Sequence, residues 1–244
     1  MMIARNLSPP LPKSWHSKPT KARIAIKRET MEQIWLQNLD EVQKVEDWVR
    51  MRAGGAQSRA VVVFGSARVS ASSQSYIEAL GMSAELARRG YFIVTGGGYG
   101  IMEAANRGAK DGGALSVGLN ISLPHEEIPN AYLDVSVQFH DFWLRKMFFE
   151  HIASAFVLFA GGFGTLDELF DVLVLIQTQK RTRRPIVLFG KEFWTPLVRF
   201  FEQSLLAHSC IERGELELVR VVENRSELLS ILLGESRESA GNAR

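Results

Sequence analysis

The residues of this chain best suited to chemistry are a basic pair and a carboxylate at the end of a glycine-rich segment. Arg145 and Lys146 precede an apolar run at 155–160, and residues 161–168 then read GGFGTLDE. The apolar run does not alternate with polar residues, which is typical of a strand covered on both faces of a parallel sheet. The order is therefore that of a strand, a phosphate loop, a helix and the carboxylate of Glu168.

The glycines of this segment favour a loop that binds an anion. Gly161, Gly162 and Gly164 permit a tight turn in which bare N–H groups approach a ligand, and Thr165 adds a hydroxyl. Apolar residues then recur at helical spacing, so an anion is expected at a helix N-terminus. Taken alone, such a turn could also merely connect a strand to a helix, and Glu168 could merely complement the helix dipole.

A second glycine cluster upstream has the same organisation. A strand is expected at 91–95, followed by the segment 96–100 (GGGYG) and a helix at 101–110. Two such loops in one domain suggest one shared ligand, with Gly97 and Gly98 as part of its site. Neither cluster fits the G-x-G-x-x-G fingerprint, and no G-x-x-x-x-G-K-[ST] loop is present, so the motifs disfavour NAD and ATP. A smaller phosphorylated ligand stays open.

Taken in order, these residues resemble the Lonely Guy (LOG) family of phosphoribohydrolases, which release the base from cytokinin riboside 5'-monophosphates and, in many members, from AMP. The similarity covers roughly residues 61–233. It rests on a first strand ending at Ser66, the loop that leads to Met102, the Arg145-Lys146 pair and the segment 161–168. The family motif is P-G-G-x-G-T-x-x-E. Ala160 stands where the proline usually lies, which alters the stiffness of the turn and removes no ligand-binding group.

The resemblance implies that Arg145 and Glu168 are catalytic, and their separation of 23 residues matches the family spacing. Cleavage of an N-glycosidic bond builds positive charge at C1', which a carboxylate can stabilise while it orients or deprotonates water. That role falls to Glu168. Arg145 stays protonated and serves positioning and electrostatics, and Lys146 is a further charge for the 5'-phosphate. From local sequence alone, the basic pair would instead be interpreted as solvated helix surface.

Other candidate groups are weaker. Met102 and Tyr99 are placed to contact the base, although Met102 also fits core packing. His125 belongs to a loop that either lines the nucleotide pocket or is exposed. The histidines and acids show no clean metal-ligand spacing, so neither a metal nor another cofactor is expected. LOG relatives were long labelled lysine decarboxylases, but the only Lys in a suggestive context, in His16-Ser17-Lys18, lies in a proline-rich leader, so decarboxylation is rejected.

The alternation of strands and helices predicts an α/β fold with a doubly wound, mainly parallel, Rossmann-like sheet and helices on both faces. Both glycine clusters then fall at the carboxyl ends of strands, where ligands bind in such sheets. The expected strands are 60–65, 91–95, 115–119, 133–139, 155–159, 185–189 and 216–222. The expected helices are 73–89, 101–110, 142–152, one from Thr165 to the basic cluster at 180–184, 193–207 and a last one ending at Leu233.

The ends of the chain differ from this catalytic domain, which is assigned to 56–234. Residues 1–28 carry seven basic residues, no acid and four prolines, as expected of a disordered leader. Without those seven, 22 basic residues face 27 acidic ones, so the body carries no nucleic-acid signature. Segment 29–55 is a helical extension that packs on its own domain or on a second subunit, and 235–244 is a tail.

Further expectations concern location and partners. No signal peptide and no apolar run of transmembrane length are evident, so a cytoplasmic protein without membrane contact is expected. The single cysteine, Cys210, allows no internal disulfide and is interpreted as an inert thiol. The resemblance implies at least a homodimer. The leading function is a nucleoside 5'-monophosphate N-ribohydrolase, and the alternative is a regulatory or carrier protein that binds the nucleotide without hydrolysis. The sequence leaves the preferred base open.

Overall fold

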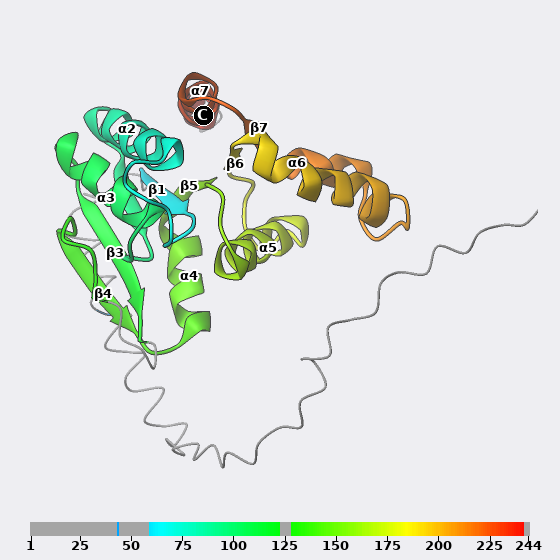
Figure 1. Ribbon diagram of the computed structural model, residues 1–244. Helices are drawn as coiled ribbons and strands as arrows, with labels where there is room; N and C mark the ends of the chain where they lie inside the picture. The colour runs from blue at the N-terminus through cyan, green and yellow to red at the C-terminus, as the bar shows by residue number, and fades with distance from the viewer. Residues whose placement is uncertain (1–42, 44–58, 123–127, 242–244) are drawn as a thin grey trace, which may run out of the picture.

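A seven-stranded sheet forms the centre of the part of the protein that the structure describes (Figure 1). The computed structural model describes residues 43, 59–122 and 128–241. The leader, nearly all of the 29–55 extension, His16-Ser17-Lys18 and His125 lie outside the described residues. In spatial order the strands are β4 (Val135–Phe139), β3 (Ser116–Ile121), β2 (Phe92–Thr95), β1 (Ala60–Phe64), β5 (Ala153–Leu158), β6 (Ile186–Phe189) and β7 (Arg220–Val222).

All neighbouring strands pair in parallel, which confirms the predicted doubly wound sheet. β1 lies at the centre and every one of its residues is buried, because helices cover both faces of the sheet. The chain builds outward from β1 to β4 and then returns to place β5 on the other side of β1. The strand order therefore reverses beside β1, and this is where doubly wound sheets form their ligand crevice.

Two separate cores hold the helices on the sheet. On one face lie α2 (Gln74–Arg88), α3 (Ile101–Asp111) and α7 (Arg225–Gly241), and on the other lie α4 (Phe142–Ile152), α5 (Phe163–Gln177) and α6 (Lys191–Phe200). Ser73 caps α2 by accepting a hydrogen bond from the Tyr76 N–H at 3.3 Å, as N-cap serines commonly do. Trp194 and Phe156 are fully buried in the core under α4–α6.

The C-terminal third differs most from the sequence prediction. The helix expected at 193–207 is divided into α6 and a π-helix, η2 (Phe201–Leu206), downstream of Pro196, which withholds one N–H from the α-helical ladder. The strand expected at 216–222 is wrong in its first half, where a 3₁₀ turn, η3 (Arg213–Leu218), begins with a reciprocal cap between Glu212 and Glu215. α7 continues to Gly241, past the expected end at Leu233.

Candidate active site

The loops that follow β1, β2 and β5 meet at one edge of the sheet. Ser66, just after β1, donates its N–H to the Ala160 carbonyl at 3.0 Å, while its own carbonyl accepts from the Ile101 N–H at 3.1 Å. Ala160 opens the glycine segment after β5, and Ile101 is the first residue of α3. The end of β1 therefore joins both glycine loops at the point where the strand order reverses.

The loop after β5 leaves backbone uncovered. The Gly162 carbonyl accepts from the N–H groups of Thr165 and Leu166, at 3.0 and 3.1 Å, and so begins α5. The N–H groups ahead of that first turn have no intrahelical acceptor and carry the positive end of the helix dipole. A methyl group added at Gly162 or Gly164 would meet nothing within 4 Å. The space beside these N–H groups suits an anion, as the glycine pattern predicts.

Thr165 packs inward against its own loop. It is buried, and a methyl group added at Gly161 would lie 2.1 Å from the Thr165 Oγ1 atom. Gly161 is therefore required for packing. The expectation that the Thr165 hydroxyl supplements the phosphate site stays a prediction, since this side chain also fills the turn.

Arg145 of α4 and Glu168 of α5 form a buried ion pair. The Arg145 guanidinium nitrogen lies 3.6 Å from a Glu168 carboxylate oxygen, and Glu168 is only 4% exposed. Two aromatic rings of α4 surround the guanidinium, with the centroids of Phe142 and Phe149 at 5.3 and 5.7 Å. Among the residues the structure describes, no group accepts a hydrogen bond from the buried Arg145 Nε. A buried donor of this kind is suited to a ligand acceptor.

Burial also tunes the protonation of this pair. Desolvation raises the pKa of Glu168 to about 7, against the opposing effects of the Arg145 and Lys146 cations. Desolvation likewise lowers the pKa of Arg145, which nevertheless stays a cation at neutral pH. A carboxyl group that titrates near neutral pH can take up and release a proton during a reaction.

Lys146 lies on the outer side of this pair. Its Nζ atom is 2.9 Å from a carboxylate oxygen of Asp167 and 3.9 Å from one of Asp171, both on α5. The lysine thus bridges α4 to α5, and its expected contact with a phosphate stays a prediction. Asp171 therefore lies beside the cation of Lys146.

The loop after β2 approaches the same arginine. A methyl group added at Gly96 would lie 3.0 Å from the Met102 Sδ atom and 3.9 Å from an Arg145 nitrogen. Met102 belongs to neither of the two cores, whereas Ile101 before it is fully buried. Arg145 therefore lies between the two glycine loops, with Met102 at its side.

Comparison with known proteins identifies the family of this chain. A family model described as possible lysine decarboxylase matches residues 102–232, more than half of the chain. The chain belongs to this family, the LOG family. Two relatives are both named cytokinin riboside 5'-monophosphate phosphoribohydrolase. That of Mycobacterium marinum is 39% identical over 61% of this chain and 80% of its own length. The relative from Mycobacterium tuberculosis is 36% identical over 65% of this chain and 88% of its own length.

Solved structures share the fold. The crystal structure titled TM1055 superposes with a TM-score of 0.54 at 26% identity, over 72% of this chain and 98% of its own. A molybdenum cofactor binding protein from Rippkaea orientalis superposes with a TM-score of 0.55 at 17% identity, over 74% and 99%. At that identity, the second likeness concerns the fold alone.

For this LOG family member, sequence reasoning missed the aromatic rings around the arginine. It also missed Asn106 and Asn130, which hydrogen-bond to each other under the loop after β2. Phe142 and Phe149 stand three residues before and four residues after Arg145, the spacing that places side chains on one helix face. That signal was available for both rings. The sequence offers no such spacing signal for Asn106 and Asn130, because their hydrogen-bond partners lie on other elements.

The described ranges also bear on metal binding, membrane crossing and the single cysteine. No three His, Cys, Asp or Glu residues there are grouped to hold a metal ion. No helix in those ranges is both long and apolar enough to cross a membrane. Cys210 is exposed and carries a free thiol.

Proposed function

We propose that this protein hydrolyses the N-glycosidic bond of nucleoside 5'-monophosphates, with cytokinin riboside 5'-monophosphate, AMP or both as substrates. The products are the free base and ribose 5-phosphate. The observation that carries the proposal is the buried Arg145–Glu168 pair beside two glycine loops at the point where the strand order reverses. The relatives named phosphoribohydrolases support the same chemistry at family level.

Substrate binding rests on the loop after β5. The 5'-phosphate binds the N–H groups between Gly161 and Thr165 at the N-terminus of α5. Glu168 lies on the next turn of the same helix, so binding the phosphate fixes the ribose relative to the carboxylate. Binding energy from this remote group then supports orientation at C1'.

The reaction breaks the bond between C1' and the base nitrogen and forms a bond from C1' to a water oxygen. As the first bond lengthens, positive charge grows on C1' and the ring oxygen, and the Glu168 carboxylate stabilises it. The same carboxylate accepts a proton from the attacking water and passes it to the nitrogen of the departing base, so one water is consumed and Glu168 returns to its starting form. Arg145 offers its unused Nε–H and its guanidinium fork to the ribose or phosphate oxygens.

Product analysis tests this proposal directly. The purified protein is incubated with AMP, with N6-isopentenyl adenosine monophosphate and with the matching nucleosides, and free base and ribose 5-phosphate are separated by chromatography. Release from the monophosphates alone is the expected result, and the relative rates identify the preferred base. Stoichiometric nucleotide binding with no base released from any substrate would replace the hydrolase by the regulatory or carrier alternative.

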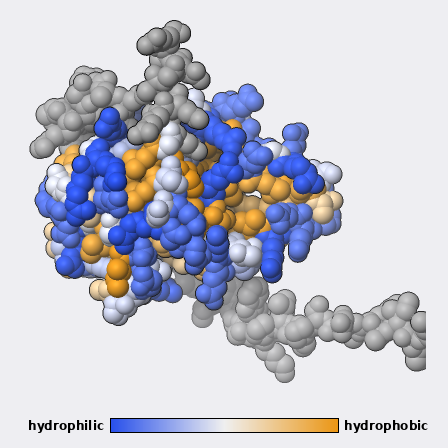
Figure 2. Space-filling view, turned by 90° about the horizontal axis from the view of Figure 1, so that it is seen from above, coloured by the Kyte–Doolittle hydropathy of each residue, from blue (hydrophilic) through white to orange (hydrophobic). Residues whose placement is uncertain are grey.

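We also propose that the protein is at least a homodimer. Large apolar side chains reach the surface along α4, α5 and α6, and Figure 2 shows hydrophobic residues at the surface of the lobe that carries α6 and η2. A second copy that covers such side chains would remove their apolar surface from water. A monomeric mass by light scattering at micromolar concentration would refute this. The exposed residues are Phe142, Trp143, Met147, Phe163, Phe170, Val174, Phe193 and Phe200.

A further inference from the structure

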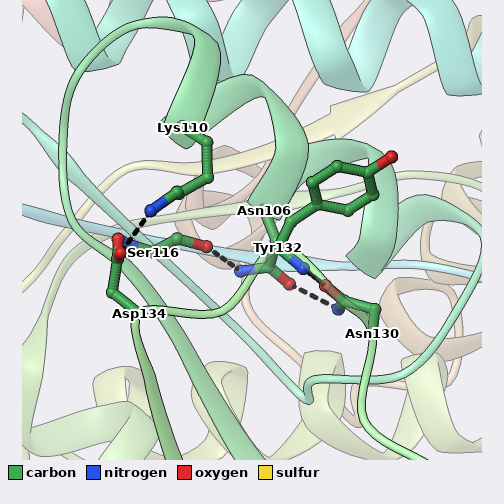
Figure 3. Close-up of polar contacts among 6 residues, drawn as sticks. All are labelled: Asn106, Lys110, Ser116, Asn130, Tyr132 and Asp134. Atoms are coloured by element: carbon green, nitrogen blue, oxygen red, sulfur yellow. Dashed lines mark hydrogen bonds and ion pairs between the residues drawn. The ribbon is translucent and has the colours of Figure 1, made fainter.

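Two buried asparagines form a hydrogen-bonded network under the glycine loop that follows β2 (Figure 3). Asn106 of α3 is fully buried, and its Oδ1 atom accepts from the Thr95 hydroxyl at 2.7 Å and from the Asn130 amide at 2.9 Å. Its own amide donates to the Ser116 hydroxyl at 2.9 Å and to the Val117 carbonyl at 3.3 Å. Asn106 thus connects α3 to β2, β3 and Asn130.

Asn130 carries this network into the loop. Its side-chain amide donates to the Gly97 carbonyl at 3.1 Å and to the Gly98 carbonyl at 2.9 Å, and its backbone N–H also donates to Gly97 at 2.9 Å. The Thr95 hydroxyl accepts from the Gly97 N–H at 2.9 Å. Two successive carbonyls of the loop therefore point toward Asn130.

Because peptide bonds are planar, the direction of these two carbonyls also fixes the direction of the N–H groups of Gly98 and Tyr99. In a trans peptide, the carbonyl of one residue and the N–H of the following residue point in opposite directions. Because the Gly97 and Gly98 carbonyls face Asn130, the N–H groups of Gly98 and Tyr99 face away from it. Within the described part of the chain, neither N–H donates to a backbone carbonyl. Successive N–H groups of this kind form a concave site for an anionic or acceptor group.

The loop cannot easily relax from this arrangement. Gly97 has a φ of 75°, and a methyl group added there would lie 2.3 Å from the Asn120 Oδ1 atom. Gly100 has a φ of 62°, and a methyl group there would lie 2.4 Å from the Ser66 carbonyl oxygen. The loop is held on one side by Asn120 and the end of β1, and on the other by Asn130.

We propose that Asn106 and Asn130 are positioning residues that aim the Gly98 and Tyr99 N–H groups at the bound nucleotide. This inference rests on the proposed function, because it assigns these donors to the nucleoside monophosphate whose phosphate binds the other loop. Asn130 acts on the loop directly, and Asn106 fixes the Asn130 amide.

The test compares Asn130→Ala and Thr95→Val with the control Lys110→Met. Thr95→Val keeps a β-branched residue in the strand while removing the hydroxyl that accepts from Gly97, so it tests the same loop with little change in shape. Lys110 pairs with Asp134 at the edge of the network (Figure 3) and makes no hydrogen bond to the loop, so its loss serves as the matched control. Each variant is measured for AMP affinity, for kcat and KM, and for amide hydrogen exchange of residues 96–100.

The expected result is a rise of about tenfold in the dissociation constant and KM for AMP in both loop variants. We expect kcat to change much less because Glu168 is untouched, and exchange of the Gly97 N–H, which bonds to Thr95, to become faster even without AMP. Lys110→Met should resemble the wild type in every measurement. Wild-type affinity and wild-type exchange in folded Asn130→Ala or Thr95→Val would overturn the inference. If the wild type binds AMP without releasing base, the proposed hydrolysis fails, while affinity and exchange still decide the positioning role.

Discussion

The two glycine loops share a composition and use it differently. In the loop after β2, glycine is needed because Gly97 and Gly100 adopt positive φ and face close neighbours. In the loop after β5, Gly162 and Gly164 have open space where a side chain would lie. The first loop is thus braced by side chains, whereas the second presents bare backbone. Glycine content alone therefore does not reveal whether a loop is packed or left open for a ligand.

The difference extends to the elements that follow. The braced loop leads into α3, whose buried Asn106 belongs to a polar network with its hydrogen-bonding capacity filled. The open loop leads into α5, whose buried Glu168 faces an arginine with an unused donor. A filled network suits support, and an incompletely paired one suits ligand binding. We therefore expect the largest functional losses from changes beside the open loop.

The largest expected effect is that of Glu168→Gln. The amide keeps the shape of the side chain but supplies neither the negative charge nor a general base. We therefore expect kcat for release of the nucleobase to fall by roughly 10²–10⁴-fold. Asp167→Asn is the matched control, because this neighbour on α5 is 58% exposed in its side chain and pairs with Lys146. We expect the control to retain most activity. Base release by Glu168→Gln within a few-fold of the wild type would remove Glu168 from the mechanism.

The same substitution should change how stability depends on pH. The folded-state pKa of Glu168 is raised to about 7, so the folded state binds more protons than the unfolded state between the ordinary pKa and pH 7. The wild type therefore loses stability as pH rises through this window, whereas Glu168→Gln does not. The stability of the variant relative to the wild type should increase by up to about 3 kcal/mol from pH 4.5 to pH 8.

Urea unfolding at the two pH values measures this change. Asp167→Asn again provides the control and should follow the wild type. The sign matters more than the size, because a difference that decreases with rising pH would mean that Glu168 is not a desolvated acid.

A smaller loss is expected for Arg145→Lys. Lysine keeps the charge beside Glu168 but lacks the buried Nε–H and the planar fork that binds two oxygens in a fixed geometry. We expect kcat/KM for AMP to fall by about 30-fold, or roughly 2 kcal/mol in transition-state stabilisation. Steady-state kinetics measure this, with Lys146→Arg as a control that keeps the outer cation. Full activity in Arg145→Lys would contradict this, because it would mean that only the charge of Arg145 contributes to the reaction.

Much of the fold was predictable because its signals are local. Continuous apolar runs marked β1 and β5, since strands buried on both faces have no polar side to alternate with. The prediction was wrong at 216–218, which was assigned to a strand. There the reciprocal cap of Glu212 and Glu215 stabilises a 3₁₀ turn instead.

Less of the candidate site was predictable. Arg145 and Glu168 were expected to be catalytic through the resemblance and its spacing, and the structure places their charged groups 3.6 Å apart. The partners of Lys146 and the support of the braced loop after β2 depend on side chains from separate elements. Asn130 lies 33 residues from the Gly97 that it holds, and no periodicity in the sequence connects them.

The smallest expected effect concerns the stiffness of the open loop. Ala160→Pro restores the residue that the LOG motif usually carries, and it keeps the carbonyl that accepts from the Ser66 N–H. In the described part of the chain, the Ala160 N–H donates to no backbone carbonyl, so proline removes no such bond. By restricting the unfolded chain, it should add about 0.4–1 kcal/mol to the free energy of unfolding. Ala160→Gly should lower the free energy of unfolding by a similar amount, because glycine loses more freedom on folding.

The catalytic rate should hardly respond to either change. Because the phosphate-binding N–H groups are unchanged, kcat should stay within about twofold of the wild type in both variants, where 1.4 kcal/mol would correspond to tenfold. Destabilisation by Ala160→Pro would mean that the turn is held in a conformation that proline cannot adopt, and the open loop would then be as constrained as the braced one.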